Sequence, residues 1–210
     1  MEVGPGLAYE PVQDGEIVAV VTFLEMHRPP HGPVPSSSLR LRQMHPPMLE
    51  DYRALFRRVG ARWLWFSRLL RDDESLGAII HHPGVQVFAV EDEEQSDVGL
   101  LELDFREPGE CELSFVGLIP EMSGQGHGRW LIAEALRRAW SDGVKRVHVH
   151  TCSLDHPAAL AAYRRAGFVA LKRAIERFPD PRLLGVLPMD CAPQFPVIGS
   201  PESVSPRPAS

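Results

Sequence analysis

The chain is poor in cysteine and has no long apolar run. Its three cysteines, Cys111, Cys152 and Cys191, lie far apart among 210 residues, so they form neither a disulfide framework nor a paired metal-ligand motif. The N-terminus lacks the basic start and apolar core of a signal peptide, and no apolar run approaches the length of a membrane span. We therefore expect a cytoplasmic protein with no membrane partner and no metal site.

The chain also has no excess of positively charged residues over negatively charged ones. The formal net charge is −6, which argues against broad binding to nucleic acid. With 44% apolar and 24% charged residues, the chain can form one globular domain with a sizeable core. We place this domain at residues 16–187, after an N-terminal extension at 1–15. Residues 188–210 hold six prolines and several serines, so we expect this tail to be extended or disordered.

The apolar pattern predicts the element order β-α-α-β-β-β-α-β-α-β. A continuous apolar run predicts a first strand within 16–25, and four prolines predict a loop at 28–37. Apolar residues at i, i+3, i+4 and i+7 predict a helix that begins near Tyr52 and ends at Gly60. The further strands are expected at 85–91, 98–105, 112–119, 145–151 and from 168, and the further helices near 76–80, at 129–140 and around residue 163.

Three alternating glycines form the most informative motif of the chain. The sequence Gly124-Gln125-Gly126-His127-Gly128 lies between a predicted strand and a predicted helix. Glycine lets the backbone approach a ligand, and a helix N-terminus offers free N–H groups at the positive end of its dipole. A phosphate or pyrophosphate fits such a place. A dinucleotide fingerprint is excluded because residue 129 is arginine, and a Walker-type loop because no lysine follows. A strand-to-helix turn without a ligand remains the alternative.

Two segments resemble the GNAT superfamily of acyl-CoA N-acyltransferases. The run PEMSGQGHG is similar to the acyl-CoA loop Q/R-x-x-G-x-G/A, with Gly126 and Gly128 at the small positions and Ser123 in place of Gln or Arg. Downstream, DHPAALAAYRRAGF is similar to the segment N-x-x-A-x-x-x-Y-x-x-x-G-F, with Tyr163 at the tyrosine and His156 in place of Asn. The likeness extends over roughly residues 85–173.

The resemblance implies an α/β (α+β) GNAT fold, with a mixed, largely antiparallel sheet flanked by helices. In that fold two central parallel strands, here 112–119 and 145–151, splay apart and admit the pantetheine arm of the cosubstrate, acetyl-CoA. The loop from Ser123 to Gly128 would bind its phosphates. Backbone groups near Leu118 and Ile119 would bind the pantetheine and the acyl carbonyl. His156 is either a residue of the helix start or a further pantetheine contact.

The chemistry of acetyl transfer directs attention to one tyrosine and three carboxylates. Tyr163 is the candidate general acid, because a phenol with a pKa of about 10 carries a proton at neutral pH. Its alternative role is that of a core aromatic. Glu112 is the candidate base, fourteen residues before Gly126, which resembles the spacing in histone-acetylating members. Glu102 and Asp104 on the preceding strand are rivals, as is a water molecule.

These expectations converge on one function. The chain is expected to move an acetyl group from acetyl-CoA to a primary amine of a small molecule, by direct attack in a ternary complex. Acetylation of a protein N-terminus or lysine, and a non-catalytic acyl-CoA-binding regulatory module, remain alternatives. The region of Trp63, Trp65 and Phe66 would cover the acceptor or serve only as buried aromatics. The sequence names neither the acceptor nor the acyl length, and it leaves a homodimer open.

Overall fold

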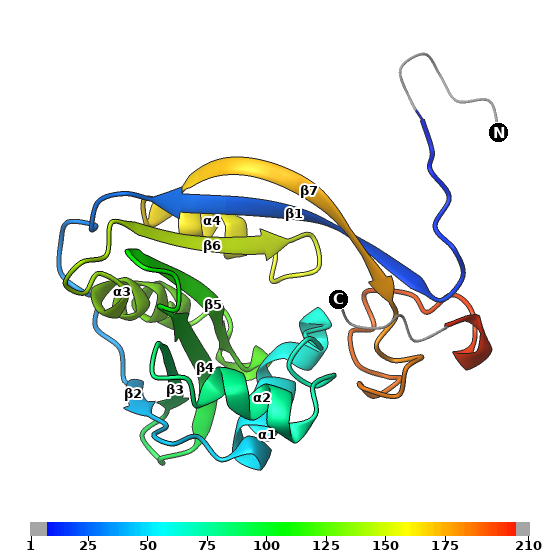
Figure 1. Ribbon diagram of the computed structural model, residues 1–210, viewed down its shortest axis with the longest axis horizontal. Helices are drawn as coiled ribbons and strands as arrows, with labels where there is room; N and C mark the ends of the chain where they lie inside the picture. Colours follow the sequence, from blue (N-terminus) through cyan, green and yellow to red (C-terminus); the bar gives the residue numbers. More distant parts are fainter. Residues whose placement is uncertain (1–7, 205–210) are drawn as a thin grey trace.

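A computed structural model describes residues 8–204, and within them seven strands form one mixed sheet (Figure 1). The strands are β1 (Glu16–Met26), β2 (Arg40–Gln43), β3 (Val85–Glu91), β4 (Asp97–Asp104), β5 (Glu110–Leu118), β6 (Arg146–Cys152) and β7 (Val169–Pro179). The helices are α1 (Leu49–Gly60), α2 (Asp73–Ile80), α3 (His127–Ala139) and α4 (Ala159–Arg165), with short 3-10 turns at Ala61–Trp63, Pro120–Met122 and Pro201–Ser203. This mixed α/β architecture confirms the predicted fold class.

The one parallel pair of strands in the described chain, β5 and β6, lies inside the sheet. The strand order is β2-β3-β4-β5-β6-β1-β7, and every other neighbouring pair is antiparallel. The β5–β6 ladder runs only from Glu110 opposite Arg146 to Glu112 opposite His148. Beyond this point β5 continues beside β4 alone, while β6 continues beside β1 (Figure 1). The two strands therefore splay apart where the sequence predicted a gap.

Strand β2 was not predicted. Three of its four residues are polar, so its sequence carries no apolar run or alternation that would indicate a strand. Charge pairing holds it to β3 instead. The carboxylate of Glu91, which is 6% exposed, accepts from Nε of Arg40 at 2.8 Å and also bonds Arg42. Arg42 reaches Asp97 of β4 as well. The strand is thus specified by partners that are distant in sequence.

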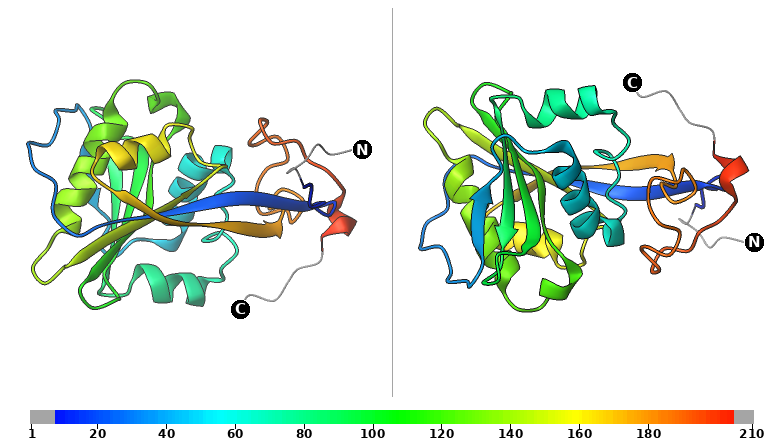
Figure 2. Two further views of the ribbon diagram at one scale, coloured as in Figure 1. Left: turned by 90° about the horizontal axis from the view of Figure 1, so that it is seen from above. Right: turned by 90° about the horizontal axis from the view of Figure 1, so that it is seen from below.

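The helices cover both faces of the sheet through their apolar stripes. The spacing that predicted α1 buries Tyr52, Leu55, Phe56 and Val59. In α3 one stripe of residues is buried as well: Leu131, Ile132, Ala135, Leu136 and Ala139. Burying a leucine or phenylalanine side chain contributes roughly 1.5–3 kcal/mol, so these stripes dock the helices. Helices α1 and α2 lie on one side of the sheet and α3 and α4 on the other (Figure 2). No helix within residues 8–204 has the length and apolar character that crossing a bilayer requires.

The first part of the C-terminal tail packs against the domain, in contrast to the extended or disordered state expected for 188–210. Ala192 is 1% exposed, and Phe195 packs with it on a second apolar cluster that includes Leu64 and Leu154. The buried guanidinium of Arg182 donates to the carbonyl oxygen of Phe195 at 2.8 Å. Proline-rich composition did not reveal this docking, because a few apolar side chains and one buried arginine supply it. Residues 205–210 lie outside the described residues.

We expect removal of residues 189–210 to destabilise the fold. Arg182, which is 3% exposed, would keep its ion pair with Asp180 but lose carbonyl acceptors from the tail. Leaving donors of a buried charged group without acceptors costs about 1–3 kcal/mol, and the apolar cover of Leu64 would be lost in addition. Urea unfolding followed by circular dichroism measures the loss. Met189→Ala is the control, because Met189 is 55% exposed. An unchanged unfolding midpoint after truncation would contradict the expectation.

Candidate functional site

The glycine loop between β5 and α3 presents open backbone. Gly124 and Gly126 adopt φ angles of 81° and 84°, which glycine reaches without strain, and Gly126 caps α3. A Cβ atom placed on Gly124, Gly126 or Gly128 would meet no atom within 4 Å. The first N–H groups of α3 have no partner inside the helix. The loop therefore has the geometry of an anion site, with room for a ligand directly against the backbone.

Side chains stabilise this loop from both ends. Gln125 donates to the carbonyl oxygen of Glu121 at 3.1 Å, and Nδ1 of His127 lies 2.9 Å from the hydroxyl of Ser37. Ser123 lines the cleft beside the loop, and its N–H bonds the carbonyl oxygen of Pro120. These contacts occupy the side chains of Gln125 and His127. The backbone is the part of the loop that faces the cleft.

A cleft of about 1630 Å³ runs from this loop to the far face of the sheet. Its lining includes the divergent part of β5, the end of β6, α4 and the segment from Trp63 to Arg68. Because β5 and β6 share no hydrogen bonds beyond Glu112, the cleft passes through the sheet between them. A ligand chain that enters at the glycine loop can therefore meet a second ligand that approaches from the α1 side.

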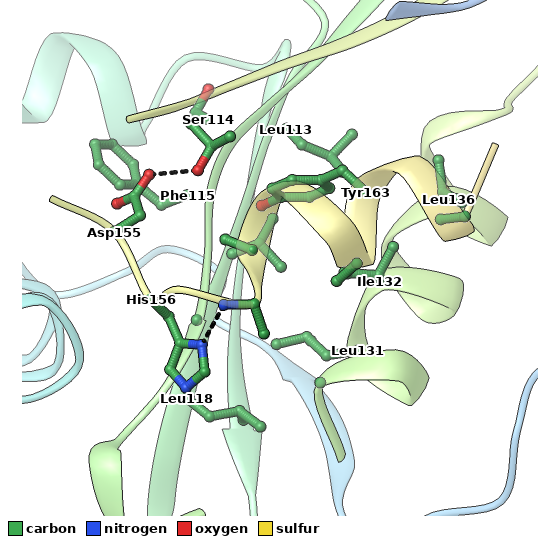
Figure 3. A pocket seen from close by; sticks show the side chains of 18 of the residues that line it. Leu113, Ser114, Phe115, Leu118, Leu131, Ile132, Leu136, Asp155, His156 and Tyr163 are labelled. Carbon is green, nitrogen blue, oxygen red and sulfur yellow. Dashed lines mark hydrogen bonds between the residues drawn. The ribbon is translucent and has the colours of Figure 1, made fainter. Parts of the chain in front are cut away.

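Tyr163 lies on the wall of this cleft. It is 7% exposed, packs edge-to-face against Phe168 and projects from α4 toward the face of β5 that carries Leu113 (Figure 3). Burial raises the pKa of the phenol well above its usual value, and the charge of Asp155 adds to this effect. Within residues 8–204 its hydroxyl takes part in no hydrogen bond. The phenol is thus fully protonated and free to bond a ligand.

The three candidate carboxylates lie in different environments. Glu102 is 0% exposed and accepts from the Tyr52 hydroxyl and from Arg68, each at 2.6 Å, so it is a buried structural group. Asp104 lines the cleft but is held by Arg106. Glu112 also lines the cleft, at the last position of β5 that pairs with β6. Of the three, Glu112 lies best for chemistry in the gap.

Sequence reasoning missed the partner of Glu112. Nδ1 of His150 on β6 lies 3.4 Å from Oε1 of Glu112, and both side chains line the cleft. The contact lowers the pKa of the Glu112 carboxyl and raises the pKa of the His150 imidazole. Glu112 and His150 belong to strands predicted to be neighbours, so the alternation of β6 was the available signal. The register that pairs them appears only in the folded sheet.

The backbone of β5 divides its hydrogen bonds between two sides. The N–H of Ile119 bonds the carbonyl oxygen of Val98 at 2.9 Å, so it faces β4 and is not available to a ligand. Backbone direction alternates along a strand, and the N–H of Leu118 therefore faces the gap. Leu118 also lines the cleft, whereas Ile119 is 8% exposed. Of the two residues named from the resemblance, Leu118 has an N–H that faces the gap and Ile119 does not, and the N–H of Val116 faces the gap as well.

The loop after β6 connects the cleft to the aromatic segment. Asp155 accepts from the Thr151 hydroxyl at 2.7 Å, from the Cys152 N–H at 2.8 Å and from Nε1 of Trp65 at 3.2 Å. His156 accepts from the N–H of Ala158 at 3.1 Å, as a residue of a helix start would (Figure 3). Its ring also packs edge-on against Trp63. Asp155, which sequence reasoning missed, thus joins the end of β6 to the aromatic segment.

Comparison with known proteins identifies the family. The model of the acetyltransferase (GNAT) family matches residues 46–168, more than half of the chain. The chain belongs to this family. It is a member in which the glycine loop, Tyr163 and the gap between β5 and β6 border one cleft. No curated protein matches the chain.

Solved structures share the GNAT fold at low identity. A GCN5-related N-acetyltransferase from Sphaerobacter thermophilus aligns with a TM-score of 0.54 and 18% identity, covering 81% of this chain and 53% of that chain. This chain thus spans about half the length of that protein. A spermidine N-acetyltransferase from Vibrio cholerae, in complex with CoA and spermine, aligns with a TM-score of 0.52 and 23% identity. The alignment covers 71% of this chain and 99% of that chain. An aminoglycoside acetyltransferase from an uncultured soil metagenomic sample aligns with a TM-score of 0.53 and 20% identity. The alignment covers 66% of this chain and 93% of that chain.

The burial of Glu102 leads to a stability prediction. Glu102→Gln should lower the free energy of unfolding by about 3–5 kcal/mol, because it removes a fully buried charge and leaves Arg68, whose side chain is 13% exposed, without its counter-charge. Asp104→Asn is the matched control on the same strand, since its partner Arg106 is 41% exposed and such pairs contribute at most about 1 kcal/mol. Chemical denaturation of both variants gives the two values. Equal, small losses would show that Glu102 is not a structural ion-pair residue.

Proposed function

We propose that this chain is an acetyl-CoA-dependent N-acetyltransferase that acts on a primary amine of a small molecule. The observation that carries the proposal is the passage through the sheet. The open glycine loop lies at one end, Tyr163 and the Glu112–His150 pair lie beside the gap, and an aromatic wall lies on the far side. Family membership supports acyl transfer, and the small-molecule amines named for two structural neighbours support the acceptor class.

The glycine loop suits the phosphates of CoA. Pyrophosphate needs N–H donors and positive potential, and the start of α3 offers both. The empty space over Gly124, Gly126 and Gly128 lets phosphate oxygens reach the backbone. The pantetheine arm would then extend along the gap-facing edge of β5, where the N–H of Leu118 can bond it. When bound, acetyl-CoA supplies the activated acyl group as a thioester.

Direct attack fits the groups in the cleft better than an acyl-enzyme does. Cys152 lines the cleft, but burial raises the pKa of its thiol to about 11, so little thiolate exists at neutral pH to accept the acetyl group. The amine nitrogen therefore attacks the thioester carbonyl carbon itself. The C–S bond breaks, and Tyr163 donates its phenolic proton to the departing sulfur. N–H groups on the gap-facing edge of β5, those of Val116 and Leu118, are placed to stabilise the carbonyl oxygen.

The acceptor side favours a cation. Glu112 and Glu176 line the cleft there, and the aromatic rings of Trp65 and Phe115 lie 5.2 Å apart in its wall. An alkylammonium ion is attracted by both carboxylates and aromatic faces. Thiol release from acetyl-CoA, assayed with polyamines, aminoglycosides, lysine and peptide N-termini, tests the proposal. Turnover with a small amine supports it. Turnover with peptides alone, or CoA binding without any turnover, would replace it with one of the two alternatives.

Substitution of Gly128 tests the phosphate site without straining the backbone. Gly124 and Gly126 have positive φ, so any side chain there perturbs the fold, whereas Gly128 is helical with open space over its Cα. Gly128→Val should weaken CoA binding at least about tenfold, or 1.4 kcal/mol, by placing methyl groups where phosphate would lie. Isothermal titration calorimetry measures the affinity. Gly77→Val, at a helical glycine outside the cleft, is the control. Equal affinities in the two variants would place the phosphates elsewhere.

Tyr163→Phe tests the general acid. The ring packing against Phe168 is retained and only the proton is lost, so turnover should fall about 10²–10⁴-fold while CoA affinity changes little. Steady-state thiol release and calorimetry provide the two numbers. A comparable loss of CoA affinity, or an unchanged rate, would make the hydroxyl a binding or packing group.

A further inference from the structure

The structure assigns the proton-accepting role to His150, with Glu112 as the residue that positions it. This inference rests on the proposed function and names a further catalytic residue for it. The sequence pointed to a carboxylate alone, because the imidazole lies on another strand. The folded sheet brings the two side chains together at the vertex of the gap.

The position of the pair relative to Tyr163 supports this assignment. The side chain of Leu113 lies beside Tyr163, on the α3–α4 side of β5 (Figure 3). Neighbouring residues of a strand point to opposite faces, so Glu112 faces the acceptor side. On β6, Val147 pairs with Cys111, so Val149 shares the face of Leu113. His150 therefore points to the opposite face, where it packs against Phe23. The acid and the base thus lie on opposite sides of the gap, the acid toward the departing sulfur and the base toward the incoming amine.

His150 has one nitrogen to orient it and one for a ligand. Nδ1 contacts Glu112, and within residues 8–204 no hydrogen bond uses Nε2. Its side chain is 49% exposed, compared with 32% for Glu112, so the imidazole is the more accessible of the pair. A carboxylate on Nδ1 favours the tautomer whose Nε2 is free to accept a proton. The pair therefore resembles an oriented base rather than two independent groups.

The charged surroundings tune the imidazole. The groups that act on it are Glu112 from β5, Glu176 from β7, Asp155 from the loop after β6 and His148 from β6, with Lys172 of β7 over the ring of its neighbour Phe23. The carboxylates, Glu112 above all, raise the pKa of His150 above its usual value of about 6.5. A raised pKa gives the imidazole a higher proton affinity, which favours its taking a proton from an ammonium ion.

The proton balance closes with these residues. An ammonium substrate gives one proton to Nε2 of His150, and the imidazolium is held by Glu112. The neutral amine forms the N–C bond, the C–S bond breaks, and the sulfur takes the proton of Tyr163. The second proton of the nitrogen returns to the phenolate, and His150 releases its proton to water. The net products are the amide, the free thiol and one proton.

Kinetics of four variants test the assignment. His150→Gln should lower kcat about 10²-fold or more and leave CoA affinity unchanged. His27→Gln, at an exposed histidine outside the cleft, should have nearly wild-type kcat. In the wild type, activity should rise with pH as His150 becomes neutral. In Glu112→Gln this ascending limb should move to lower pH, because the main cause of the raised pKa of His150 is gone. Imidazole should partly rescue His150→Ala.

The outcomes separate the inference from the function it rests on. If the wild type releases no thiol with any amine, the proposed function fails and takes the catalytic role with it. If the wild type is active while His150→Gln keeps its kcat and pH profile, the inference alone is overturned. If Glu112→Gln abolishes turnover and His150→Gln does not, Glu112 is itself the base. A proton NMR titration of the His150 ring, in the wild type and in Glu112→Gln, measures the pKa shift independently of turnover, and an unshifted pKa would also overturn the pair.

Discussion

The hydrogen-bond ladder between β5 and β6 stops at Glu112 and His148, and the site depends on that break. Inside most sheets, strands on both edges of a buried strand pair with its backbone N–H and C=O groups. Here β5 keeps β4 on one edge and leaves the other edge open over its second half. The open edge supplies unpaired backbone groups in the interior of the protein, which a ligand with alternating donors and acceptors can satisfy. The same divergence makes room for that ligand to pass through the sheet.

The elements around this gap form its walls. The glycine loop follows directly from the end of β5, so the anion site and the free strand edge are joined by a few residues. Asp155 bonds Thr151, Cys152 and Trp65 at once and so fixes the wall of the cleft that carries the aromatic segment. The docked tail packs behind the same wall through Leu64 and Leu154. The C-terminal segment therefore supports this wall indirectly, through packing.

Local pattern predicted most of the fold. The i, i+3, i+4, i+7 spacing of α1 and the stripe of α3 gave those helices, and the glycine spacing gave the loop. The motif residues of the resemblance located Tyr163 and the two divergent strands. What escaped was determined by partners far away in sequence. Strand β2 depends on Glu91, and the tail depends on Arg182. Pattern alone cannot identify such partners.

The site was predictable to the level of strands but not of individual atoms. The alternation of β5 predicted which face of the sheet carries Glu112. That Glu102 and Asp104 are held by arginine side chains, however, appears only in the folded structure. His150 became a candidate because register placed it 3.4 Å from Glu112. The N–H of Ile119 does not face the gap, because backbone alternation turns it toward β4. Each of these distinctions concerns direction and contact, which a one-dimensional pattern does not encode.

A crystal structure of the full chain with CoA tests the central claim most directly. The account predicts the pyrophosphate against the backbone of residues 124–128, the pantetheine arm bonded to the gap-facing edge of β5, and the sulfur between β5 and β6 within reach of the Tyr163 hydroxyl. A CoA molecule bound elsewhere, or one whose thiol stays on the α3–α4 side of the sheet away from the gap, would contradict it.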